Sequence, residues 1–339
     1  MKILVTGGGG FLGSTICHQL LARNEKVIAF QRSDSEKLRD LGADIFRGCI
    51  TDKRLLETAL QGVDAVIHTA ARAGPWGSYA EYYQPNVLGT ENVIAACRSN
   101  GIHKLVFTSS PSVVHSDNDI EGGDESLPYP EHFSSHYPAT KALAEQRVMA
   151  AHDSELQTIS LRPHLIWGPG DQHLLPRLVK RARSGKIKLP APEKLIDAVY
   201  IDNAAGAHLL ALDCLQSRPE VVGGKTYFIS NDEPISHRRI IGGLLEAAGL
   251  EVEIPAISPR LVIAAGTVVE TIWRWLRLRS EPPITRFMAE HLATAHWFDI
   301  SAAKRDLSYE AEVSIAEGLE RLRLSLRIIP ASTIGIHHP

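Results

Sequence analysis

The stretch Ile3-Leu4-Val5-Thr6-Gly7-Gly8-Gly9-Gly10-Phe11-Leu12-Gly13 decides the fold class of this 339-residue chain. Its first residues predict a short buried strand, its consecutive glycines predict a tight turn, and the apolar spacing that follows predicts a helix. This order is typical of a dinucleotide-binding turn, because glycine lets the backbone approach a pyrophosphate and a helix N-terminus offers unpaired N–H groups. The candidate dinucleotide contacts of this stretch are Gly7, Gly10, Phe11, Leu12 and Gly13.

Short apolar runs that alternate with helical patterns continue this arrangement along the chain. Strands separated by helices predict a parallel, doubly wound α/β sheet of the Rossmann type. The expected strands are residues 3–5, 27–30, 44–47, 65–68, 104–107, 158–161 and 225–230. The alternation loosens after about residue 170, where the sequence becomes mainly helical. We therefore expect a dinucleotide-binding domain of residues 1–170 and 199–230, a smaller substrate-binding region of residues 171–198 and 231–326, and a flexible tail of residues 327–339.

Four segments carry more local predictions. Residues 117–130 are acidic and rich in glycine and proline, which predicts an exposed loop. Residues 85–99 predict a helix, and residues 187–189 a short strand. Residues 258–278 predict a long helix that is largely apolar and has one polar stripe. This helix has three open interpretations: a lid over an apolar pocket, a contact with a membrane surface, or a contact with another subunit or a partner enzyme.

Composition and charge narrow the functional classes. The net charge of −3 provides no positive surface for nucleic acid. The cysteines Cys17, Cys49, Cys97 and Cys214 form no C-x-x-C pair, so we expect neither a disulfide framework nor a metal site. The N-terminal residues show no signal-peptide pattern, and no segment reaches the length of about 20 apolar residues that spans a bilayer. The expected setting is therefore cytoplasmic, with the membrane-surface contact left open.

The end of the second expected strand bears on the choice of cofactor. A carboxylate at this place would bind the ribose 2′-hydroxyl of NAD, but the chain has Gln31 followed by Arg32. A neutral residue followed by a guanidinium suits a 2′-phosphate, so the pair favours NADP(H) over NAD(H). The alternative is that Arg32 is an ordinary solvated loop residue.

Small and hydroxyl-bearing residues follow the fourth and fifth expected strands, at the edge where a doubly wound sheet binds its ligand. Serine at such places can also serve only in turns and helix caps. Four hydroxyl-bearing residues among residues 108–112 nevertheless favour ligand contacts over purely structural roles. The candidates are Ala70 and Ala71 for the cofactor, Ser110 for catalysis, and Trp76, Ser78, Tyr79 and Ser112 for the substrate.

Tyr137 and Lys141 are the candidate proton-transfer pair. They are four residues apart, so on a helix both side chains lie on one face. An ammonium beside a phenol favours the phenolate and lowers a phenol pKa that is otherwise about 10. Such a pair is common by chance, and the alternative is a surface tyrosine beside a solvated lysine. Its position after a glycine turn and a hydroxyl-rich strand end makes the functional interpretation the stronger one.

Several motifs, taken together, resemble those of a known family. They are Thr6-Gly7-x-x-Gly10-Phe11-Leu12-Gly13, Asn86-Val87-x-Gly89-Thr90, Tyr137-Pro138-Ala139-Thr140-Lys141-Ala142, Arg162-Pro163-x-x-Ile166-Trp167-Gly168-Pro169-Gly170 and Pro283-Ile284-Thr285-Arg286-Phe287. The set resembles the extended short-chain dehydrogenase/reductases, and within them the 3β-hydroxysteroid dehydrogenase branch. It is similar in particular to the bacterial 2-alkyl-3-oxoalkanoate reductases of long-chain olefin biosynthesis, over roughly residues 1–325.

The resemblance implies a role for each matching residue. Tyr137 would donate the proton in ketone reduction, Lys141 would lower its pKa and hold the nicotinamide ribose, and Ser110 would bind the carbonyl oxygen. Asn86 would support the lysine. Ile50 and Pro163 would contact the cofactor, although residues 48–50 lack the acid that many members place there for the adenine amine. His164 is a candidate substrate residue at a position where this branch has an arginine.

The implied function is the NADPH-dependent reduction of the ketone of a large hydrophobic 3-oxo acid to the 3-hydroxy acid. A 3β-hydroxysteroid or sterol dehydrogenase is the alternative, since both reactions need a long apolar pocket. A nucleotide-sugar epimerase and a non-catalytic NADP sensor are weaker alternatives. The expected partner is a hydrophobic small molecule. The sequence decides neither for nor against a homodimer.

Overall fold

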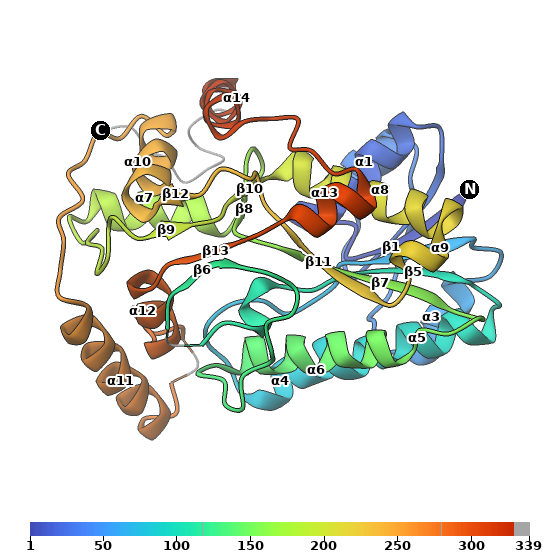
Figure 1. The fold of residues 1–339 in the computed structure, drawn as a ribbon, viewed down its shortest axis with the longest axis horizontal. Coiled ribbons are helices and arrows are strands. Elements are labelled where there is room, and N and C mark those ends of the chain that lie inside the picture. Colours follow the sequence, from blue (N-terminus) through green and yellow to red (C-terminus); the bar gives the residue numbers. More distant parts are fainter. Residues whose placement is uncertain (117, 279, 329–339) are drawn as a thin grey trace.

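Seven parallel strands form the central sheet in the computed structural model, which describes residues 1–116, 118–278 and 280–328 (Figure 1). Their order across the sheet is β3-β2-β1-β4-β5-β7-β11. The bounds are Lys2–Thr6 (β1), Lys26–Gln31 (β2), Asp44–Arg47 (β3), Ala65–His68 (β4), Lys104–Thr108 (β5), Gln157–Pro163 (β7) and Lys225–Ile229 (β11). The predicted doubly wound parallel sheet is confirmed.

The strand order reverses beside β1, and this reversal fixes where a ligand can bind. β1 pairs with β2 on one side and with β4 on the other, and the last pair of the β1–β4 register is Thr6 with His68. The loops that leave β1 and β4 therefore start side by side at the carboxyl edge of the sheet. In doubly wound folds, the crevice outside this point holds the ligand.

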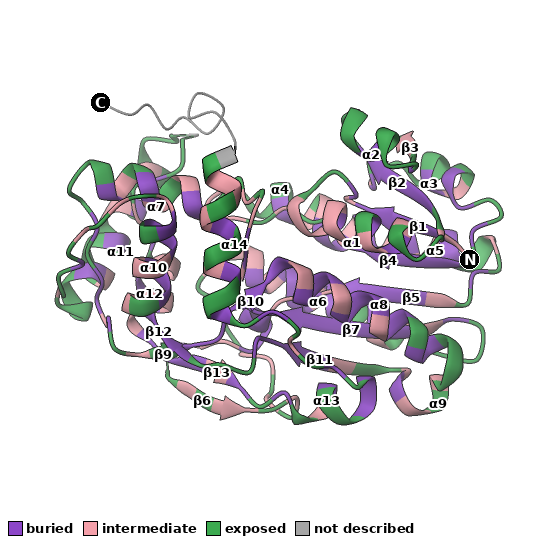
Figure 2. Ribbon diagram, turned by 90° about the horizontal axis from the view of Figure 1, so that it is seen from above, coloured by how far each residue is buried: buried purple, intermediate pink, exposed green. Residues whose placement is uncertain are grey.

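Helices cover both faces of the sheet and bury its apolar side chains (Figures 1 and 2). On one face, α1 (Phe11–Ala22), α8 (Ile201–Ser217) and α13 (Ser301–Leu307) contribute to the larger core. On the other face, α3 (Lys53–Ala59), α5 (Gly89–Ser99) and α6 (His136–Ala150) pack on Leu4, Val66 and Leu105. The short helices α2 (Glu36–Asp40) and α9 (Pro219–Val222) lie at the edges.

The helix predicted for residues 85–99 is longer at its N-terminus than the sequence pattern indicates. Helical structure starts with α4 (Tyr79–Tyr83), passes through a π-helical segment (Gln84–Leu88) and continues as α5. Ser78 caps α4 reciprocally with Glu81: the Glu81 N–H donates to the serine hydroxyl, and the Ser78 N–H donates to the carboxylate at 2.8 Å. Pro85 marks the π-helical segment inside this helical run rather than its beginning.

A second group of elements lies beside the carboxyl edge of the sheet. It includes α7 (Leu174–Arg183), α10 (His237–Ala247), α14 (Ile315–Ile328) and the strand pair β8 (Ile166–Trp167) and β10 (Val199–Tyr200). These elements share a second apolar core around Trp167, Leu175 and Leu244. The predicted division into a dinucleotide-binding domain and a substrate-binding region stays a prediction.

Two local predictions in this region are wrong. The predicted loop 117–130 contains β6 (Ile120–Gly123), which joins β9 (Leu195–Ile196), β12 (Ile235–Ser236) and β13 (His296–Phe298) in a small sheet. Residues 187–189 form no strand and make only a bridge from Leu189 to Ala256. The partners of these short strands lie far away in the sequence, so a local pattern does not reveal them. Residue 117 and residues 329–339, which include most of the predicted tail, lie outside the described residues.

α11 (Pro259–Trp275) and α12 (Arg286–Ala293) form a pair beside the small sheet (Figure 1). Gly266 allows close contact, because a Cβ there would lie 2.9 Å from the Thr285 carbonyl carbon. The outer face of α11 exposes a row of apolar side chains, namely Leu261 at 66%, Val268 at 58%, Ile272 at 42% and Trp275 at 81%. Within the described ranges, no helix has the length and hydrophobicity to cross a membrane.

Candidate active site

The glycine turn is shaped by contacts that only glycine permits. Gly7 has a φ of 70°, and a Cβ on Gly13 would lie 2.2 Å from the Gly7 carbonyl oxygen. The first helical hydrogen bond of α1 runs from the Ser14 N–H to the Gly10 carbonyl. The amides of Phe11, Leu12 and Gly13 therefore lie in the first turn of α1 without intrahelical partners, as in helix N-termini that bind phosphate groups.

The loop after β4 lies directly against this turn. A Cβ on Gly7 would meet the Ala70 Cα and N at 3.0 Å, which places Ala70, and Ala71 after it, at the mouth of the crevice. The two strand ends are tied together by a hydrogen bond of 2.6 Å between the Thr6 hydroxyl and His68 Nδ1. Burial lowers the pKa of His68 to about 3, so this imidazole is neutral. His68 was not among the predicted residues, because nothing in its local sequence indicates a buried histidine.

The predicted adenosine side of the crevice contains Gln31, Arg32 and Ile50. Gln31 is buried and its amide donates to the Ser33 carbonyl at 2.8 Å, while its Oε1 has no hydrogen-bond partner among the described residues. A Cβ on Gly9 would lie 2.7 Å from that Oε1, so the unsatisfied acceptor faces the glycine turn. Arg32 is exposed. Ile50 is buried against Gly89.

Lys141 is fixed by the end of β5. It lies on α6, which begins after Ser135, and its Nζ donates to the Thr108 carbonyl at 2.6 Å and lies 4.2 Å from the centre of the Phe107 ring. The side chain is only 3% exposed, and this burial lowers the pKa of Lys141 from 10.5 to about 7. The ammonium is therefore held in place by a carbonyl and an aromatic face rather than by a carboxylate.

Tyr137 and Ser110 meet across the crevice. Burial raises the pKa of Tyr137, and a hydrogen bond with Ser110 opposes this effect. Ser110 caps the 3₁₀ turn Pro111–Val113, and its hydroxyl lies 2.8 Å from that of Ser112. The structure thus brings Ser110, in the segment after β5, to Tyr137 of α6, and it fixes Lys141 of the same helix at the Thr108 carbonyl, two residues before Ser110. The net direction of the Tyr137 shift is upward, whereas the sequence argument considered only the lowering effect of Lys141.

Two contacts that the sequence does not reveal hold α6 in position. The Asn86 amide donates to the hydroxyl of Thr140 at 3.0 Å and to the carbonyl of Arg72 at 3.1 Å, so it supports the residue before Lys141 rather than the lysine itself. Glu145 forms a buried ion pair with Arg162 at 2.6 Å, which joins α6 to β7. Because both partners are buried, each satisfies the charge of the other.

A cavity of about 1290 Å³ adjoins this group of residues. Its wall includes His136, the neighbour of Tyr137, and Tyr82, whose ring centre lies 6.5 Å from that of Tyr137. The predicted substrate residues Trp76, Ser78 and Tyr79 also line it, but the Ser78 hydroxyl is engaged in the cap of α4. The opposite wall comes from α11 and α12, through Thr267, Glu270, Thr271, Trp273, Arg274, Arg286 and Glu290.

The remaining predicted residues lie away from the cavity wall. Ser112 is buried beside Ser110. Pro163 ends β7 and pairs in register with Ile229. His164, the next residue, is 5% exposed and its Nε2 lies 2.8 Å from His296 Nδ1. Burial and neighbouring histidines lower the pKa of His164 to about 3, so it is a neutral group within a histidine cluster.

Comparison with known proteins agrees with this architecture. The chain matches the 3-beta hydroxysteroid dehydrogenase/isomerase family over residues 4–257. It is 51% identical to a 2-alkyl-3-oxoalkanoate reductase of Stenotrophomonas maltophilia, over 96% of this chain and 99% of that protein. It is 46% identical to a 2-alkyl-3-oxoalkanoate reductase of Shewanella oneidensis, over 95% and 85%. A UDP-glucose 4-epimerase of Thermus thermophilus in complex with NAD has a similar structure, with a TM-score of 0.72, 26% identity and coverage of 96% and 99%.

Proposed function

Because the chain belongs to the 3-beta hydroxysteroid dehydrogenase/isomerase family, we propose that it reduces the ketone of a large hydrophobic 3-oxo acid, a 2-alkyl-3-oxoalkanoate, to the 3-hydroxy acid with NADPH. It is an NAD(P)-dependent oxidoreductase with a short-chain dehydrogenase/reductase fold. The observation that carries the proposal is the hydrogen bond between Ser110 and Tyr137, with Lys141 fixed at the Thr108 carbonyl, beside a cavity of about 1290 Å³. The names of the two similar reductases support the substrate class.

The residues of the crevice fit a nicotinamide dinucleotide. The glycine turn has no Cβ atoms to obstruct a pyrophosphate, and the amides of Phe11, Leu12 and Gly13 would bind its oxygens. The unsatisfied Oε1 of Gln31 would accept a hydroxyl of the adenosine ribose. When bound in its reduced form, the nicotinamide supplies the hydride.

In this reaction the protein supplies position and the proton. The Ser110 hydroxyl would donate a hydrogen bond to the carbonyl oxygen as negative charge develops there, and the Tyr137 hydroxyl would transfer its proton to the same oxygen. A raised pKa keeps Tyr137 protonated at neutral pH, which suits a donor in the reducing direction. Lys141 would hold the ribose hydroxyls, because its ammonium is fixed at the Thr108 carbonyl.

The choice of NADP(H) over NAD(H) is part of the proposal. β2 ends with the neutral Gln31, and Arg32 follows it exposed at the crevice side of the sheet. Arg47 of β3 pairs in register with Gln31, so a second guanidinium belongs to the neighbouring strand end. The positions of Gln31, Arg32 and Arg47 thus provide two guanidinium groups and no carboxylate, which favours a cofactor with a 2′-phosphate.

The lining of the cavity favours an acid over a neutral steroid, which is the second candidate. Aromatic side chains such as Trp76, Phe133 and Trp273 suit a hydrocarbon chain, while Arg72 and Arg274, which also line the cavity, suit a carboxylate. Both arginines are paired with glutamates, at 3.7 Å to Glu81 and 3.6 Å to Glu270, and would exchange or share these partners with the substrate.

NADPH oxidation with a 2-alkyl-3-oxo acid, its methyl ester and a 3-oxosteroid tests the function. We expect the acid to have the highest kcat/KM, and Tyr137→Phe to lower kcat by about two to four orders of magnitude. Tyr83→Phe is the control, because Tyr83 lies on α4 but is not among the residues that line the cavity. A higher kcat/KM with the steroid would replace the first candidate by the second. Undiminished activity of Tyr137→Phe would overturn the mechanism.

A further inference from the structure

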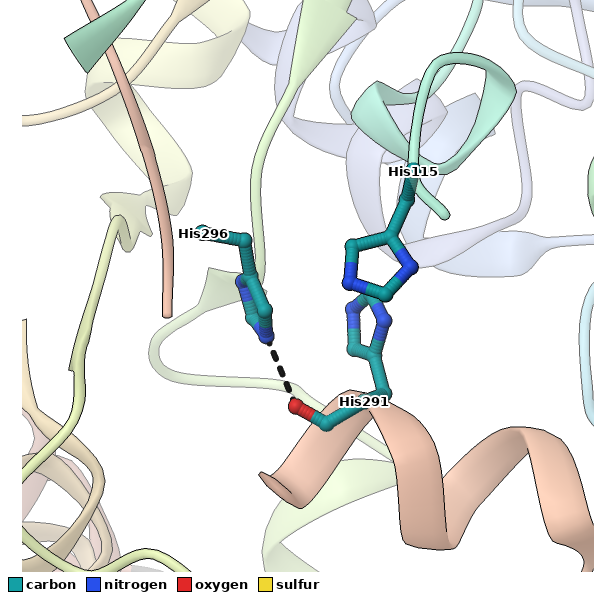
Figure 3. A group of neighbouring side chains, drawn as sticks. All are labelled: His115, His291 and His296. Atoms are coloured by element: carbon teal, nitrogen blue, oxygen red, sulfur yellow. Dashed lines mark hydrogen bonds between the residues drawn. The ribbon is translucent and has the colours of Figure 1, made fainter. Parts of the chain in front are cut away.

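A cluster of histidines lies where the segment after β5 meets α12 and β13. His115 lies two residues beyond the 3₁₀ turn, His291 lies in the last turn of α12, and His296 begins β13. Figure 3 shows the His115 and His291 rings directed toward each other from opposite elements, with the His296 ring beside them. Each of the three offers one ring nitrogen, and these nitrogens lie within 4.8 Å of one another. The proposed reaction uses none of them.

We propose that His115, His291 and His296 form a binding site for one divalent transition-metal ion of the Zn²⁺ type. Three imidazole ligands with a further position for water or a ligand are a recurrent zinc arrangement. Imidazole nitrogens also suit Co²⁺, Ni²⁺ and Cu²⁺, whereas Mg²⁺ and Ca²⁺ prefer oxygen ligands. This site differs from the expectation of no metal, which considered only the cysteines.

Hydrogen bonds around the cluster bear on which ring nitrogens carry a proton. The Thr294 hydroxyl donates to the Glu290 carbonyl at 3.1 Å, so His115 Nε2, 3.1 Å from the same hydroxyl, is the protonated nitrogen of that ring. His291 Nδ1 is buried and has no hydrogen-bond partner within the described part of the chain. An imidazole nitrogen without a hydrogen-bond partner can bind a metal ion without first giving up another bond.

A second layer of residues orients the ligands. His296 Nε2 donates to the His291 carbonyl at 2.8 Å, and His164 lies 2.8 Å from His296 Nδ1. His237 Nε2 donates to the Thr294 carbonyl at 3.2 Å. Partners of this kind fix the ring orientation and tautomer of metal-bound histidines. One of the two hydrogen bonds of His296 would be exchanged for the metal bond.

Metal binding requires a modest rearrangement of the rings. Zinc bonds of about 2.0–2.1 Å in a tetrahedral site place ligand nitrogens about 3.4 Å apart. The rings of His291 and His296 now stack at 4.1 Å with 26° between their planes, so they must turn until both lone pairs point at one ion. His115 lines the large cavity together with Glu290, and the remaining coordination position would therefore face that cavity.

The test uses the full-length chain without an affinity tag, stripped with a chelator and then desalted. Co²⁺ is added as the spectroscopic probe, because its visible absorption reports coordination number, and Zn²⁺ is used to displace it. We expect one tightly bound Co²⁺ per chain, displaced by one equivalent of Zn²⁺. Since loss of an outer-layer partner alone costs about 10- to 100-fold in affinity, His115→Gln and His291→Gln, each of which removes a ligand, should weaken binding by at least ~100-fold.

His132→Gln is the matched control, because His132 lines the same cavity but lies outside the cluster. It should bind Co²⁺ as the wild type does. Circular dichroism verifies folding, and the two ligand variants test the site independently if one of them misfolds. Absence of a stoichiometric Co²⁺ spectrum in the wild type overturns the proposal. Equal binding by the wild type and both ligand variants also overturns it, because the ion would then lie on other histidines.

Discussion

The proposed role of Arg32, binding the 2′-phosphate of NADPH, depends on its positive charge. If it binds the 2′-phosphate, Arg32→Ala removes a charge-assisted hydrogen bond worth about 1.5–3 kcal/mol, and KM for NADPH should rise by about 10- to 100-fold. KM for NADH should stay the same, because NADH has no phosphate at this position. Steady-state kinetics with both cofactors measures the difference.

The control for this prediction is Arg39→Ala. Arg39 is also exposed, but it lies on α2 and pairs with Asp34 at 2.6 Å. An equal loss of NADPH affinity in both variants would indicate a general effect of surface charge. An equal loss of NADPH and NADH affinity in Arg32→Ala would assign the arginine to another part of the cofactor.

Lys141 links catalysis to the pH dependence of stability. Its pKa is about 7 in the folded protein and 10.5 when exposed, so between these values the unfolded chain binds more protons. The buried Lys141 therefore lowers the free energy of unfolding most below pH 7. This destabilisation declines as the pH rises toward 10.5. Lys141→Met should be inactive, and its stability relative to the wild type should fall by about 2 kcal/mol between pH 7 and pH 9.

Urea unfolding of the cofactor-free wild type and variant at several pH values measures this difference. Comparing the two proteins removes the contributions of the other titrating groups, which both share. A difference in stability that does not change with pH would show that Lys141 titrates near its ordinary pKa. The lost hydrogen bond to Thr108 shifts the whole curve but does not change its slope.

The proposed catalytic residues could be named from the sequence, but the contacts that position them could not. Tyr137 and Lys141 are neighbours on one helix face, so their spacing predicts that they act together. The bond from Asn86 to Thr140 joins residues that are 54 positions apart, and the histidine cluster joins His115 to His296. Such contacts depend on how the elements pack, and no local pattern encodes them.

At the scale of the elements, the buried strands were predictable because their short apolar runs alternate regularly with helical patterns. β3 and β4 have the predicted bounds. The short strands β6 and β9 were missed because two to four residues form a strand only when a distant partner completes the ladder. The pair Ser78 and Glu81 is a local sequence signal for a helix that begins at Tyr79. The proline at position 85 instead favoured a helix that begins there.

α11 has an inner and an outer face, and one tryptophan on each separates the two predictions for this helix. Trp273 lines the cavity, whereas Trp275 is 81% exposed. Trp273→Ala should raise KM for a long-chain 3-oxo acid by about 10-fold, since burying an aromatic side chain is worth about 1.5–3 kcal/mol and part of it would be retained. Trp275→Ala should leave KM unchanged. Steady-state kinetics with a short and a long substrate measures both.

The same pair tests the predicted membrane contact. Only the outer face of α11 could enter a bilayer surface, so flotation with phosphatidylcholine vesicles should depend on Trp275 and not on Trp273. If the wild type does not float with vesicles, the exposed apolar row has another role. If KM rises in both variants, Trp275 also contributes to the cavity in solution.

At the scale of the whole molecule, the seven-stranded sheet and the second apolar core are built from interleaved parts of the chain. Strand β11 returns to the sheet after α7, β9 and β10 have joined the second group of elements. The sequence indicated this return, because a strand pattern at residues 225–230 follows the irregular stretch. It could not indicate how firmly the two parts are coupled, since that depends on the contacts between them.

Hydrogen exchange with and without NADPH measures this coupling. A ligand present at 100 times its Kd stabilises the unit that binds it by about 2.7 kcal/mol, and only amides that open together with that unit gain this protection. If the two parts open separately, residues 1–170 and 199–230 should exchange more slowly with NADPH, while residues 171–198 and 231–326 should change little. Similar protection of α10 and β11 would instead show that the chain opens as one unit, because these elements belong to different parts of the predicted division.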